Sequence, residues 1–501
     1  MKIFINYVIL ITLLCALPFA GKAQGNWVVK FDSPENEGAG DFIENSNGYF
    51  IGIISKHNSN TDKYEPYFYK ININGDTLYS KKYIKSGTNS FTHIIQSDTN
   101  PVEYLVCGYE MRNGIFDFFI KTDSTFNTIW EKTYRLCPPD ISSSFEYKQQ
   151  FLKKKDSGYV FATLYDNGGN QRLVFFEIDE NGDSVAYRAY AGDSAGRGLH
   201  DLYYNHDSSA YMVNVYHTHY IPYWGETQIL TIDFDFNQTT VTYLPRWHEA
   251  ITSRVLPGGS IVSGGIYDGY ILNPYQHLKQ ICALKYYTLM TLTDSTYFTN
   301  PDAEIGKREG YYRSIDYYYP NSIFVAGTYD YDVGIWVPHP SWIAIAKMDS
   351  NLNLLTEKYI GGDAFYLLSD IVATSDGGLL ISTSRYDYNS QIQEHDGYIF
   401  KLDSLDLLVG NYEHKTGKQV KNAIVYPNPT RNKTTIYVRT AVQDARFVLY
   451  DLNGRKIKTV ILNKQSLVTP VTISGLPAGN YVWRVIKQNK QIETGKLLII
   501  N

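Results

Sequence analysis

Cysteine is scarce in this 501-residue chain, and one of its four cysteines lies in an N-terminal apolar segment that we expect to be removed. The other three, Cys107, Cys137 and Cys282, allow at most one internal disulfide and leave a free thiol. No Cys-x-x-Cys pair occurs. These spacings support neither a disulfide-stapled scaffold nor a structural zinc site.

The chain also lacks a strong excess of either charge and any sustained helical periodicity. Lys and Arg number 46 against 51 Asp and Glu, and the formal net charge of −5 provides no basic field for nucleic acid. A hydrophobic share of 44% is ample for a large core. Aromatic residues, in contrast, are abundant, with 45 Tyr, 23 Phe and 7 Trp. Because aromatic side chains favour strands, the sequence predicts an all-β fold.

Long hydrophobic runs are missing except at the N-terminus. Lys2 precedes an apolar run over residues 9–17, and the small residues Gly21 and Ala23 fit a cleavage site. This pattern predicts a secretory signal peptide over residues 1–23. The run is too short to span about 30 Å of hydrocarbon comfortably, and no second candidate follows, so we expect no transmembrane segment.

A motif recurs through the middle of the chain, consisting of an apolar run, Lys-x-Asp or a close variant, and a turn. Successive copies are 51 to 62 residues apart, and short alternating strands flank each of them. About four strands per repeat, joined by tight turns, predict a seven-bladed β-propeller over residues 24–415. The third position of the motif falls at Asn72, Asp123, Asp179, Asp233, Tyr287, Asp349 and Asp403.

The last repeat is incomplete, because no outer strand follows its Lys-x-Asp motif. A segment with the missing pattern lies directly after the predicted signal peptide, at residues 27–31. We therefore expect residues 27–31 to supply the outer strand of the last blade. Such a connection closes the ring and covers an edge that could otherwise pair with another chain.

The charge balance reverses near residue 420. Residues 421–501 carry 13 Lys and Arg against 3 Asp and Glu, a net charge of +10, which leaves −17 on residues 24–420. A change of sign this large marks a domain boundary. We predict a linker over 416–423 and a separate domain over 424–501. Alternating segments joined by turns predict that this domain is a small Ig-like β-sandwich.

Four short motifs occur in order within the C-terminal domain: Val425-Tyr426-Pro427-Asn428-Pro429, Leu449 to Arg455, Leu476 to Tyr481, and Gly495-Lys496. In these motifs the domain resembles the type A C-terminal sorting domain of cargo for the type IX secretion system of Bacteroidota. The resemblance implies binding to that machinery and passage through the periplasm to the outer cell surface or the medium. An Ig-like accessory domain that binds a partner is the alternative. The motif residues are Tyr426, Pro427, Asn428, Pro429, Asp451, Asn453, Gly454, Gly479, Tyr481, Gly495 and Lys496.

Two groups of residues could hold a metal. Alternate residues of a strand share one face, so His217 and His219 could act together. No His-Glu-x-x-His spacing occurs, and the tyrosines on either side favour an aromatic-polar surface strand, so we assign no metal ligands. The other nearby candidates for this group are His200, His206 and His248, with Asp201 and Asp207.

Two Asp/Asn-rich segments resemble the spacing of calcium loops. Both lack the bidentate Glu at the twelfth position, where Tyr190 and Leu244 stand. Both also fall on the repeated turn, where Asp and Asn side chains bond their own backbone. We expect turns and no cofactor, with calcium as the alternative. The segments are Asp179-x-Asn181-x-Asp183 and Asp233-x-Asp235-x-Asn237.

No catalytic residue can be named from the sequence. The pairs Gly258-Gly259 and Gly377-Gly378 precede neither a Lys-Ser/Thr pair nor a helix, so we interpret them as hairpin turns. No Gly-x-Ser-x-Gly sequence occurs in a strand–helix context. Scattered Asp and Glu could form a glycosidase pair, but the sequence does not show which of them approach each other.

Tyrosine clusters are the clearest sign of a binding surface. Adjacent residues of a strand point to opposite faces, so each pair is expected to divide between core and surface. The sequence favours a module that binds glycan or a surface protein. A hydrolase of extracellular polysaccharide and a structural part of a surface or gliding assembly are the alternatives. Central carboxylates about 5–10 Å apart would favour hydrolysis, and a Tyr-lined, acid-free face would favour binding. The clusters are Tyr203-Tyr204, Tyr286-Tyr287, Tyr311-Tyr312 and Tyr317-Tyr318-Tyr319.

Overall fold

The protein is described from a computed structural model of the full chain. It divides into two units, one ending at Glu413 and one beginning at His414. The first is described over residues 26–404 except 32, 34, 62, 84–87, 113, 139–148, 167–170, 192–196, 221–222, 245–247, 271–276, 288–290, 303–306, 332–337 and 391–393. The second is described over 423–499 except 427–429, 431, 439–444, 452–453, 463–467 and 488–489. The predicted signal peptide, the predicted linker up to residue 422, Pro427–Pro429 and Asn453 lie outside the described residues.

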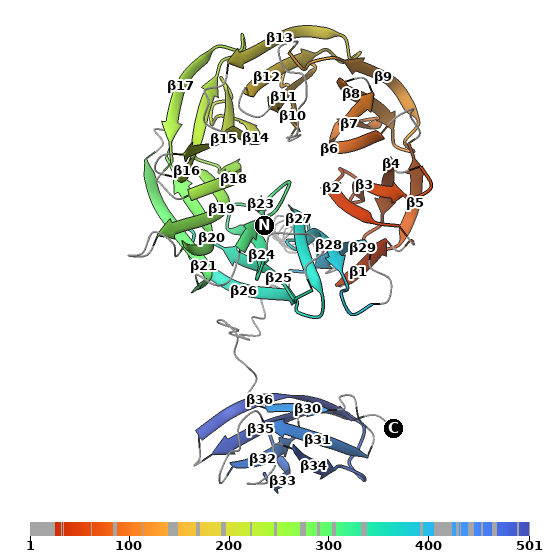
Figure 1. Cartoon of the computed structure of the whole chain (residues 1–501), viewed down its shortest axis with the longest axis vertical. Helices are drawn as coiled ribbons and strands as arrows, with labels where there is room; N and C mark the ends of the chain where they lie inside the picture. Colours follow the sequence, from red (N-terminus) through yellow and green to blue (C-terminus); the bar gives the residue numbers. More distant parts are fainter. Residues whose placement is uncertain are drawn as a thin grey trace, which may run out of the picture. The chain divides into compact units, whose positions relative to one another are not determined.

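The prediction of an all-β fold is confirmed, since the described residues form strands and turns and contain no helix. No helix long and apolar enough to cross a membrane is found in the part of the chain that the structure describes. In the first unit the described strands form seven sheets. Figure 1 shows these sheets around a common centre, the arrangement of a β-propeller. We call the sheets blades 1 to 7 in the order of their first strands.

Blades 1 to 3 consist of consecutive antiparallel strands. Blade 1 contains β2 (Glu37–Glu44), β3 (Phe50–Asn58), β4 (Lys63–Ile71) and β5 (Thr77–Lys82). Blade 2 contains β6 (Thr88–Thr99), β7 (Val102–Arg112), β8 (Gly114–Asp123) and β9 (Thr128–Tyr134). Blade 3 contains β10 (Gln149–Lys153), β11 (Tyr159–Asp166), β12 (Gln171–Ile178) and β13 (Ser184–Ala191).

Blades 4 to 6 follow the same order, with an additional short strand in blade 6. Blade 4 contains β14 (Arg197–Tyr204), β15 (Tyr211–Tyr220), β16 (Tyr223–Ile232) and β17 (Gln238–Tyr243). Blade 5 contains β18 (His248–Val255), β19 (Ile261–Tyr270), β20 (His277–Tyr286) and β21 (Leu292–Asp302). In blade 6, β22 (Lys307–Glu309) and β23 (Ile315–Tyr319) both pair with β24 (Ser322–Tyr329), and β25 (Trp342–Met348) and β26 (Leu354–Gly361) follow.

Blade 7 combines the two ends of the propeller sequence. Its first three strands are β27 (Phe365–Ala373), β28 (Leu379–Tyr386) and β29 (His395–Leu402), and its fourth is β1 (Trp27–Phe31). The register pairs Trp27 with Lys401 and Phe31 with Gly397. Side-chain bonds reinforce this pairing, because Asn26 Oδ1 accepts the Asp403 N–H at 2.8 Å. The N-terminal strand thus covers the edge of the last blade.

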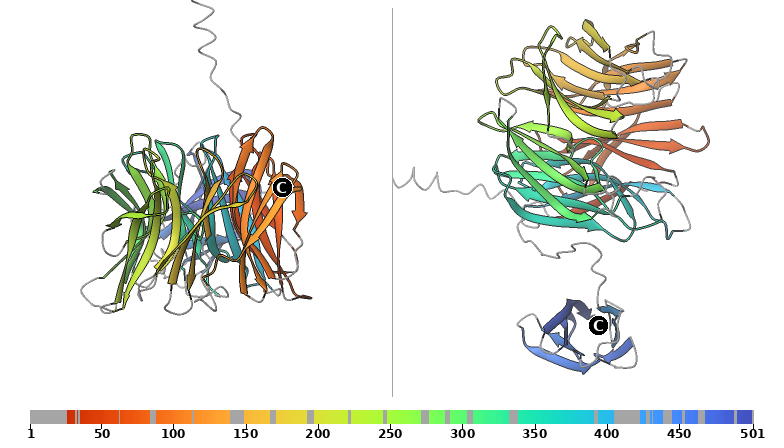
Figure 2. Two further views of the ribbon diagram at one scale, coloured as in Figure 1. Left: turned by 90° about the horizontal axis from the view of Figure 1, so that it is seen from above. Right: turned by 60° about the vertical axis from the view of Figure 1, so that its left-hand side comes forward.

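Figure 1 shows β2, β6, β10, β14, β18, β23 and β27 nearest the centre, and the last strand of each sheet at the outside. Seen from the side, the strands run between the two faces of the ring (Figure 2). On one face the repeated turn joins the third and fourth strands of blades 1 to 5 and joins β25 to β26 in blade 6. The seven Lys-x-Asp motif positions are the last residue of the strand before this face or the residue directly after it. The first strands begin at the opposite face.

The repeated turn explains the calcium-like spacing. Asp179 Oδ1 accepts the N–H groups of Asn181 and Asp183, both at 2.8 Å, and Gly182 has a positive φ of 81°. Asp233 accepts the corresponding N–H groups of its own turn. The turn interpretation predicts such bonds, in which the carboxylate accepts backbone N–H groups of its own turn.

Neighbouring blades pack in two ways at this turn. In blade 3 the turn residue is Gly182, and the Trp130 ring from blade 2 covers it and donates its Nε1–H to the Glu180 carbonyl at 2.9 Å. In blade 2 the equivalent residue is Phe126, which has a positive φ of 61° and is 1% exposed. Its ring stacks on Phe68 of blade 1 at a centroid distance of 4.9 Å. The side chain that fills the space between two blades therefore comes either from the turn of one blade or from the outer strand of the preceding blade.

The innermost strands are bonded to each other by polar side chains at β-bulges. Asp41 lies within the irregularity in β2, between Ala39 and Phe42, and accepts the Ile94 N–H of blade 2 at 2.9 Å. Asp201, after a bulge in β14, accepts the Ser253 N–H of blade 5 at 2.6 Å. Asp370 of blade 7 accepts the Phe42 N–H of blade 1 at 3.2 Å. Bulges re-aim a side chain out of the regular alternation, here toward the next blade.

The second unit contains two sheets around one core. One sheet contains β30 (Ala423–Tyr426), β31 (Lys433–Val438) and β34 (Val468–Thr472). The other contains β33 (Lys456–Ile461), β32 (Ala445–Tyr450), β35 (Gly479–Lys487) and β36 (Lys490–Ile499). Side chains from both sheets are buried together, among them Ile436 and Val471 from the first and Phe447 and Trp483 from the second.

Candidate functional site

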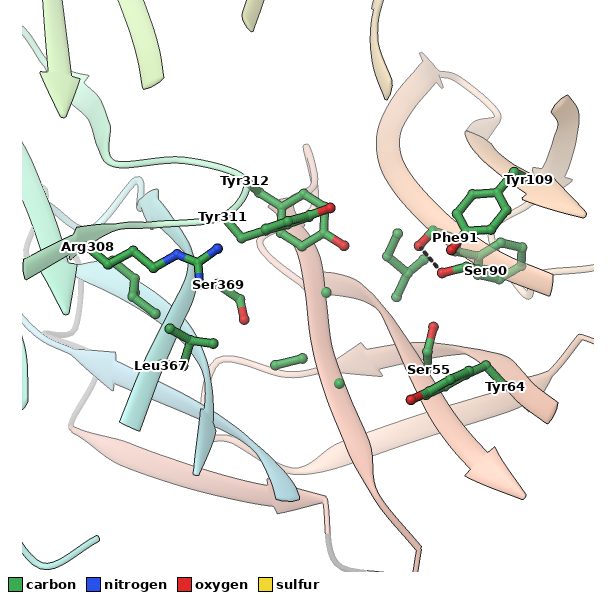
Figure 3. Close-up of a pocket in the computed structure, with 15 residues that line it drawn as sticks. Ser55, Tyr64, Ser90, Phe91, Tyr109, Arg308, Tyr311, Tyr312, Leu367 and Ser369 are labelled. Atoms are coloured by element: carbon green, nitrogen blue, oxygen red, sulfur yellow. Dashed lines mark hydrogen bonds between the residues drawn. The ribbon is translucent and has the colours of Figure 1, made fainter. Parts of the chain in front are cut away.

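A pocket of about 450 Å³ lies where blades 6, 7, 1 and 2 meet, near the beginnings of the innermost strands (Figure 3). This volume is within the range of small-molecule sites, about 300–1,000 Å³. Its lining residues are Gly38, Ala39, Gly40, Ile53, Ser55, Tyr64, Ser90, Phe91, Tyr109, Arg308, Tyr311, Tyr312, Leu367, Leu368 and Ser369.

Small residues of β2 line the pocket and help to keep it open. A Cβ atom added to Gly40 would lie 2.2 Å from the Ile53 carbonyl oxygen, so only glycine allows the two strands to approach this closely. At Gly38 a Cβ atom would meet nothing closer than the Ser55 carbonyl oxygen at 3.9 Å. Together with Ala39, these residues leave space that larger side chains of an innermost strand would fill.

Tyr311 and Tyr312 lie between the two sides of the pocket (Figure 3). The expectation that they alternate along a strand is wrong, because they lie in the loop between β22 and β23. Their N–H groups donate to the carbonyls of Leu368 and Ser369 in β27, at 3.3 and 2.7 Å. Their ring centroids are 4.9 Å apart at 82°, and Tyr311 is 43% exposed. The loop thus presents two crossed rings to the same cavity.

Two further tyrosines come from blades 1 and 2 on the opposite side (Figure 3). Tyr64, in β4, is 48% exposed, and its ring lies 5.2 Å from that of His57. Tyr109 lies near the end of β7, and burial raises the pKa of its hydroxyl. Burial also raises the pKa of Tyr312 well above its ordinary value. These two hydroxyls are therefore neutral at physiological pH and able both to donate and to accept hydrogen bonds.

The pairs at 203–204 and 286–287 divide between core and surface as expected, whereas Tyr318 and Tyr319 are adjacent and both exposed, at 52% and 49%. Tyr286 is completely buried, whereas Tyr287 is 58% exposed. Tyr203 is buried and its hydroxyl donates to Asn214. Of the four tyrosine clusters, the one at 311–312 lines the pocket.

Arg308 is the one charged residue among those that line the pocket. It lies in β22, and its Nη1–H donates to the Tyr331 hydroxyl at 2.8 Å. The guanidinium also lies over the Tyr331 ring, 5.1 Å from its centroid. No lining residue is an Asp or a Glu.

Two carboxylates of the innermost strands β2 and β27 hold the pocket loop. Arg313, directly after Tyr312, lies 2.7 Å from Asp41 and 2.6 Å from Asp370, and it also donates to the Phe42 carbonyl. The side chains of Asp41 and Asp370 are 0% exposed. This cluster ties the loop of blade 6 to blades 7 and 1.

The two carboxyls bound by Arg313 differ in their acidity. Burial alone would raise the pKa of Asp41, but His93, 2.6 Å away, and Arg313 outweigh burial and lower it to about 2. For Asp370, burial outweighs the attraction of Arg313 and raises the pKa to about 7. Two neighbouring carboxyl groups with different pKa values also occur in catalytic pairs. Here both groups are buried and bonded to backbone N–H groups, so the geometry indicates a structural role.

The histidines proposed as metal candidates are dispersed. His248 Nε2 lies 2.8 Å from the Tyr297 hydroxyl, and His200 Nε2 lies 3.8 Å from Glu249. His217 and His219 occur on β15, opposite Glu226 and Trp224 of β16, and their side chains lie outside the described part. Within the described residues, no group of three His, Cys, Asp or Glu side chains is placed to hold a metal.

The described sorting-motif residues occupy turns and a close packing contact in the second unit. Asp451 Oδ1 accepts the Arg455 N–H at 2.9 Å, and Gly454 has a positive φ of 77°. The Tyr481 hydroxyl donates to the Pro477 carbonyl at 2.8 Å. A Cβ atom at Gly495 would lie 2.5 Å from the Trp483 ring. Trp483 was missing from the sequence prediction, although its position two residues after Tyr481 places it on the same face of β35.

Gly479 and Lys496 complete the described part of the motif. Gly479 begins β35 with a positive φ of 153°, and its register partner is Ile499. The Lys496 carbonyl accepts the Trp483 Nε1–H at 3.2 Å. Gly479 and Lys496 therefore both lie in the paired strands β35 and β36, and β35 carries the buried Trp483.

The structural neighbours share low sequence identity with this chain. A polysaccharide lyase, ulvan lyase, solved with a bound glucuronic acid–rhamnose-3-sulfate unit, is 8% identical, with a TM-score of 0.47, covering 75% of this chain and 96% of its own. The polysaccharide lyase Uly1 is 9% identical, with a TM-score of 0.45, covering 78% and 94%. The β-propeller domain of the trilobed protease from Pyrococcus furiosus is 9% identical, with a TM-score of 0.39, covering 78% and 99%.

The family comparison concerns the C-terminal unit. No curated protein matches the chain. Residues 424–501 match the family described as the secretion system C-terminal sorting domain. This match has the same boundaries as the domain predicted from its four motifs. The chain is therefore a β-propeller protein with a type IX secretion C-terminal sorting domain, which directs it to the cell surface or the medium.

Proposed function

We propose that the propeller is an extracellular glycan-binding module whose ligand occupies the pocket between blades 6, 7, 1 and 2. The observation that carries this proposal is the composition of the lining. It combines four tyrosines and a phenylalanine with three serines and contains no carboxylate. An acid-free surface rich in tyrosine is the feature that the sequence argument associated with binding.

The chemistry of this lining suits a sugar. A pyranose ring has an apolar face of C–H groups and an edge of hydroxyls. Tyrosine offers a rigid aromatic face and a polar end, so one side chain can meet both parts of the sugar. Tyr64 and Tyr311, each more than two-fifths exposed, are available for stacking. The serine hydroxyls at 55, 90 and 369 add hydrogen-bonding groups.

Hydrolysis of a polysaccharide is less well supported. A glycosidase needs two carboxyl groups on either side of the scissile bond, and both must reach the substrate. Asp41 and Asp370 are completely buried behind the loop and are paired with Arg313. A structural role in a surface assembly remains compatible with the ring, but it does not require an aromatic pocket.

A binding screen on the full-length exported protein tests the proposal. A glycan array identifies a ligand, and titration calorimetry gives its affinity for the protein and for the variants Tyr64→Ala and Tyr311→Ala. We expect each variant to weaken binding about tenfold, because stacking on an aromatic side chain contributes about 1 kcal/mol or more.

Tyr243→Ala is the matched control, since Tyr243 is 60% exposed on the outer strand β17 and does not line the pocket. It should bind normally. Binding to no glycan, or equal losses in all three variants, would contradict the proposal. Release of reducing sugar by the wild-type protein would instead favour a hydrolase.

A further inference from the structure

We infer that the pocket selects an acidic sugar, one that carries a carboxylate or a sulfate, and that Arg308 binds its negative charge. This inference rests on the proposed glycan-binding function and specifies its ligand class. Three features support it: the charge of the lining, the surroundings of Arg308 and the direction of its guanidinium.

The charge of the pocket lining differs in sign from the net charge of the domain that contains it. Residues 24–420 carry a net charge of −17, yet none of the lining residues is acidic and one is an arginine. The lining itself therefore contributes one cation and no counter-ion. Among the buried carboxylates that follow or precede lining residues in sequence, Asp41 and Asp370 are paired with Arg313, and Glu37 is paired with Lys56. Exposed charges more than about 8 Å away are largely screened at physiological ionic strength.

Arg308 keeps donors available for a ligand. Its described partner is Tyr331, whose hydroxyl accepts one hydrogen bond at 2.8 Å and whose ring lies beneath the guanidinium. No carboxylate of the described residues forms an ion pair with it. A guanidinium has five N–H donors in a planar fork, so this arrangement fixes the group and leaves most of its donors unused.

The guanidinium is directed toward the cavity, beside Tyr311 and Ser369 (Figure 3). Carboxylates and sulfates present pairs of oxygens that match the fork of an arginine, and charge-assisted bonds of this kind are about twice as strong as neutral ones. A sugar ring stacked on the tyrosines would place an acidic substituent within reach of this side. A neutral sugar would instead leave the cation without a counter-ion.

The test compares oligosaccharides that differ only in charge. The full-length protein is titrated with an oligomer of uronic acids, with the same oligomer after reduction of its carboxyl groups, and with a sulfated form of that reduced oligomer. We expect the acidic or the sulfated form to bind at least tenfold more tightly than the neutral form. The tighter of the two identifies which anion is recognised.

Arg308→Gln should remove this preference and leave the affinity for the neutral oligomer within about threefold. Arg188→Gln is the matched control, because Arg188 lies on the outer strand β13, bonds Asn237 and does not line the pocket. Tyr331→Phe should reduce the preference partially, as expected of a residue that positions the guanidinium. Thermal unfolding of each variant confirms that it is folded.

Three results would overturn the inference. Equal binding of all three oligomers, unchanged in Arg308→Gln but lost in Tyr311→Ala, would reject the acidic ligand and keep the glycan site. No binding of any oligosaccharide would reject both. Binding of an acidic peptide such as polyglutamate, dependent on Arg308 and without any sugar binding, would assign the pocket to a protein partner.

Discussion

At two neighbouring blade interfaces of the propeller, the space beside the repeated turn is filled from opposite sides. Between blades 1 and 2, the turn residue Phe126 enters the interface and stacks on Phe68. Between blades 2 and 3, the turn residue is Gly182, and Trp130 of the preceding blade occupies the space. Trp27 of β1 covers Gly75 of blade 1 in the same way and donates to the Ile73 carbonyl at 2.9 Å.

An aromatic ring fills the space beside the turn at both interfaces, but the blade that supplies the ring differs. Phe126 adopts a left-handed conformation that costs a non-glycine residue of the order of 1 kcal/mol. The free energy gained by burying the Phe126 ring exceeds that cost. Glycine avoids the strain and leaves space for a tryptophan from the other blade. The interface with Trp27 also closes the ring, so its loss should have the largest consequence.

Deletion of residues 24–32 should destabilise the propeller most. It removes β1, exposes the edge of β29 and uncovers Gly75. We expect loss of the cooperative thermal transition or a fall of more than 10 °C in its midpoint, measured by calorimetry on the protein purified without its signal segment. A truncated protein that melts like the full one would show that closure by β1 is dispensable.

Phe126→Gly should have the second largest effect. The cavity left by a buried phenylalanine costs about 3–5 kcal/mol, and relief of the left-handed backbone returns about 1 kcal/mol. The expected net loss is about 3 kcal/mol in the free energy of unfolding, measured by chemical denaturation. Tyr79→Ala is the control, because Tyr79 is 42% exposed above the same turn. A smaller loss for Phe126→Gly than for this control would contradict the packing argument.

Gly182→Ala should destabilise by about 2 kcal/mol, because its Cβ atom would lie 2.6 Å from the Trp130 ring and the positive φ strains alanine. The double variant Gly182→Phe with Trp130→Ala converts this interface into the other kind. It should be more stable than the sum of its two single variants predicts, by 1 kcal/mol or more in a double-mutant cycle. Additive effects would show that the two arrangements are not interchangeable.

The two interfaces should also differ in pH dependence. Between blades 2 and 3, burial raises the pKa of Asp117, which accepts hydrogen bonds from Gln149 and Tyr165, to about 7. The folded state then holds a proton that the unfolded state loses near pH 4. The associated stability is complete below that pH and is lost as the pH rises through 7.

This contribution should amount to about 2 kcal/mol and appear as a higher unfolding midpoint at pH 5 than at pH 8. Asp117→Asn should flatten this slope. Asp41, between blades 1 and 2, has a lowered pKa of about 2, so its contribution is lost only as the pH falls through 4 toward 2. Because Asp41 also helps to raise the pKa of Asp370, Asp41→Asn should change the difference between pH 5 and pH 8, but less than Asp117→Asn does. An equal effect of both variants would reject the assignment.

Much of the fold could be predicted because its signals are local. In five copies of the Lys-x-Asp motif the side chain at the third position accepts an N–H group of its own turn, so the motif marks the end of the strand that precedes the turn. The β1 segment could be recognised by comparison with the outer strands of other repeats. The sorting domain could be recognised because turns such as that of Asp451 and Gly454 depend on a few adjacent residues.

The candidate site could not be predicted in the same way. Arg308 lies outside every repeated motif, and Gly38 and Gly40 resemble ordinary strand glycines until the Ile53 carbonyl is placed beside them. Tyr311 and Tyr312 were expected in a strand, but their backbone bonds to β27 and the Arg313 cluster hold them in a loop. None of these contacts is between residues close in sequence.

The β architecture, the repeated turns and the sorting domain can be predicted from the amino-acid sequence, because strand alternation and turn chemistry act over a few residues. The set of tyrosines that share a pocket, the carboxylates buried behind it and the side chain that fills each blade interface become visible in the folded ring. These features depend on the closed ring, which brings β2 beside β27 although more than 300 residues separate them.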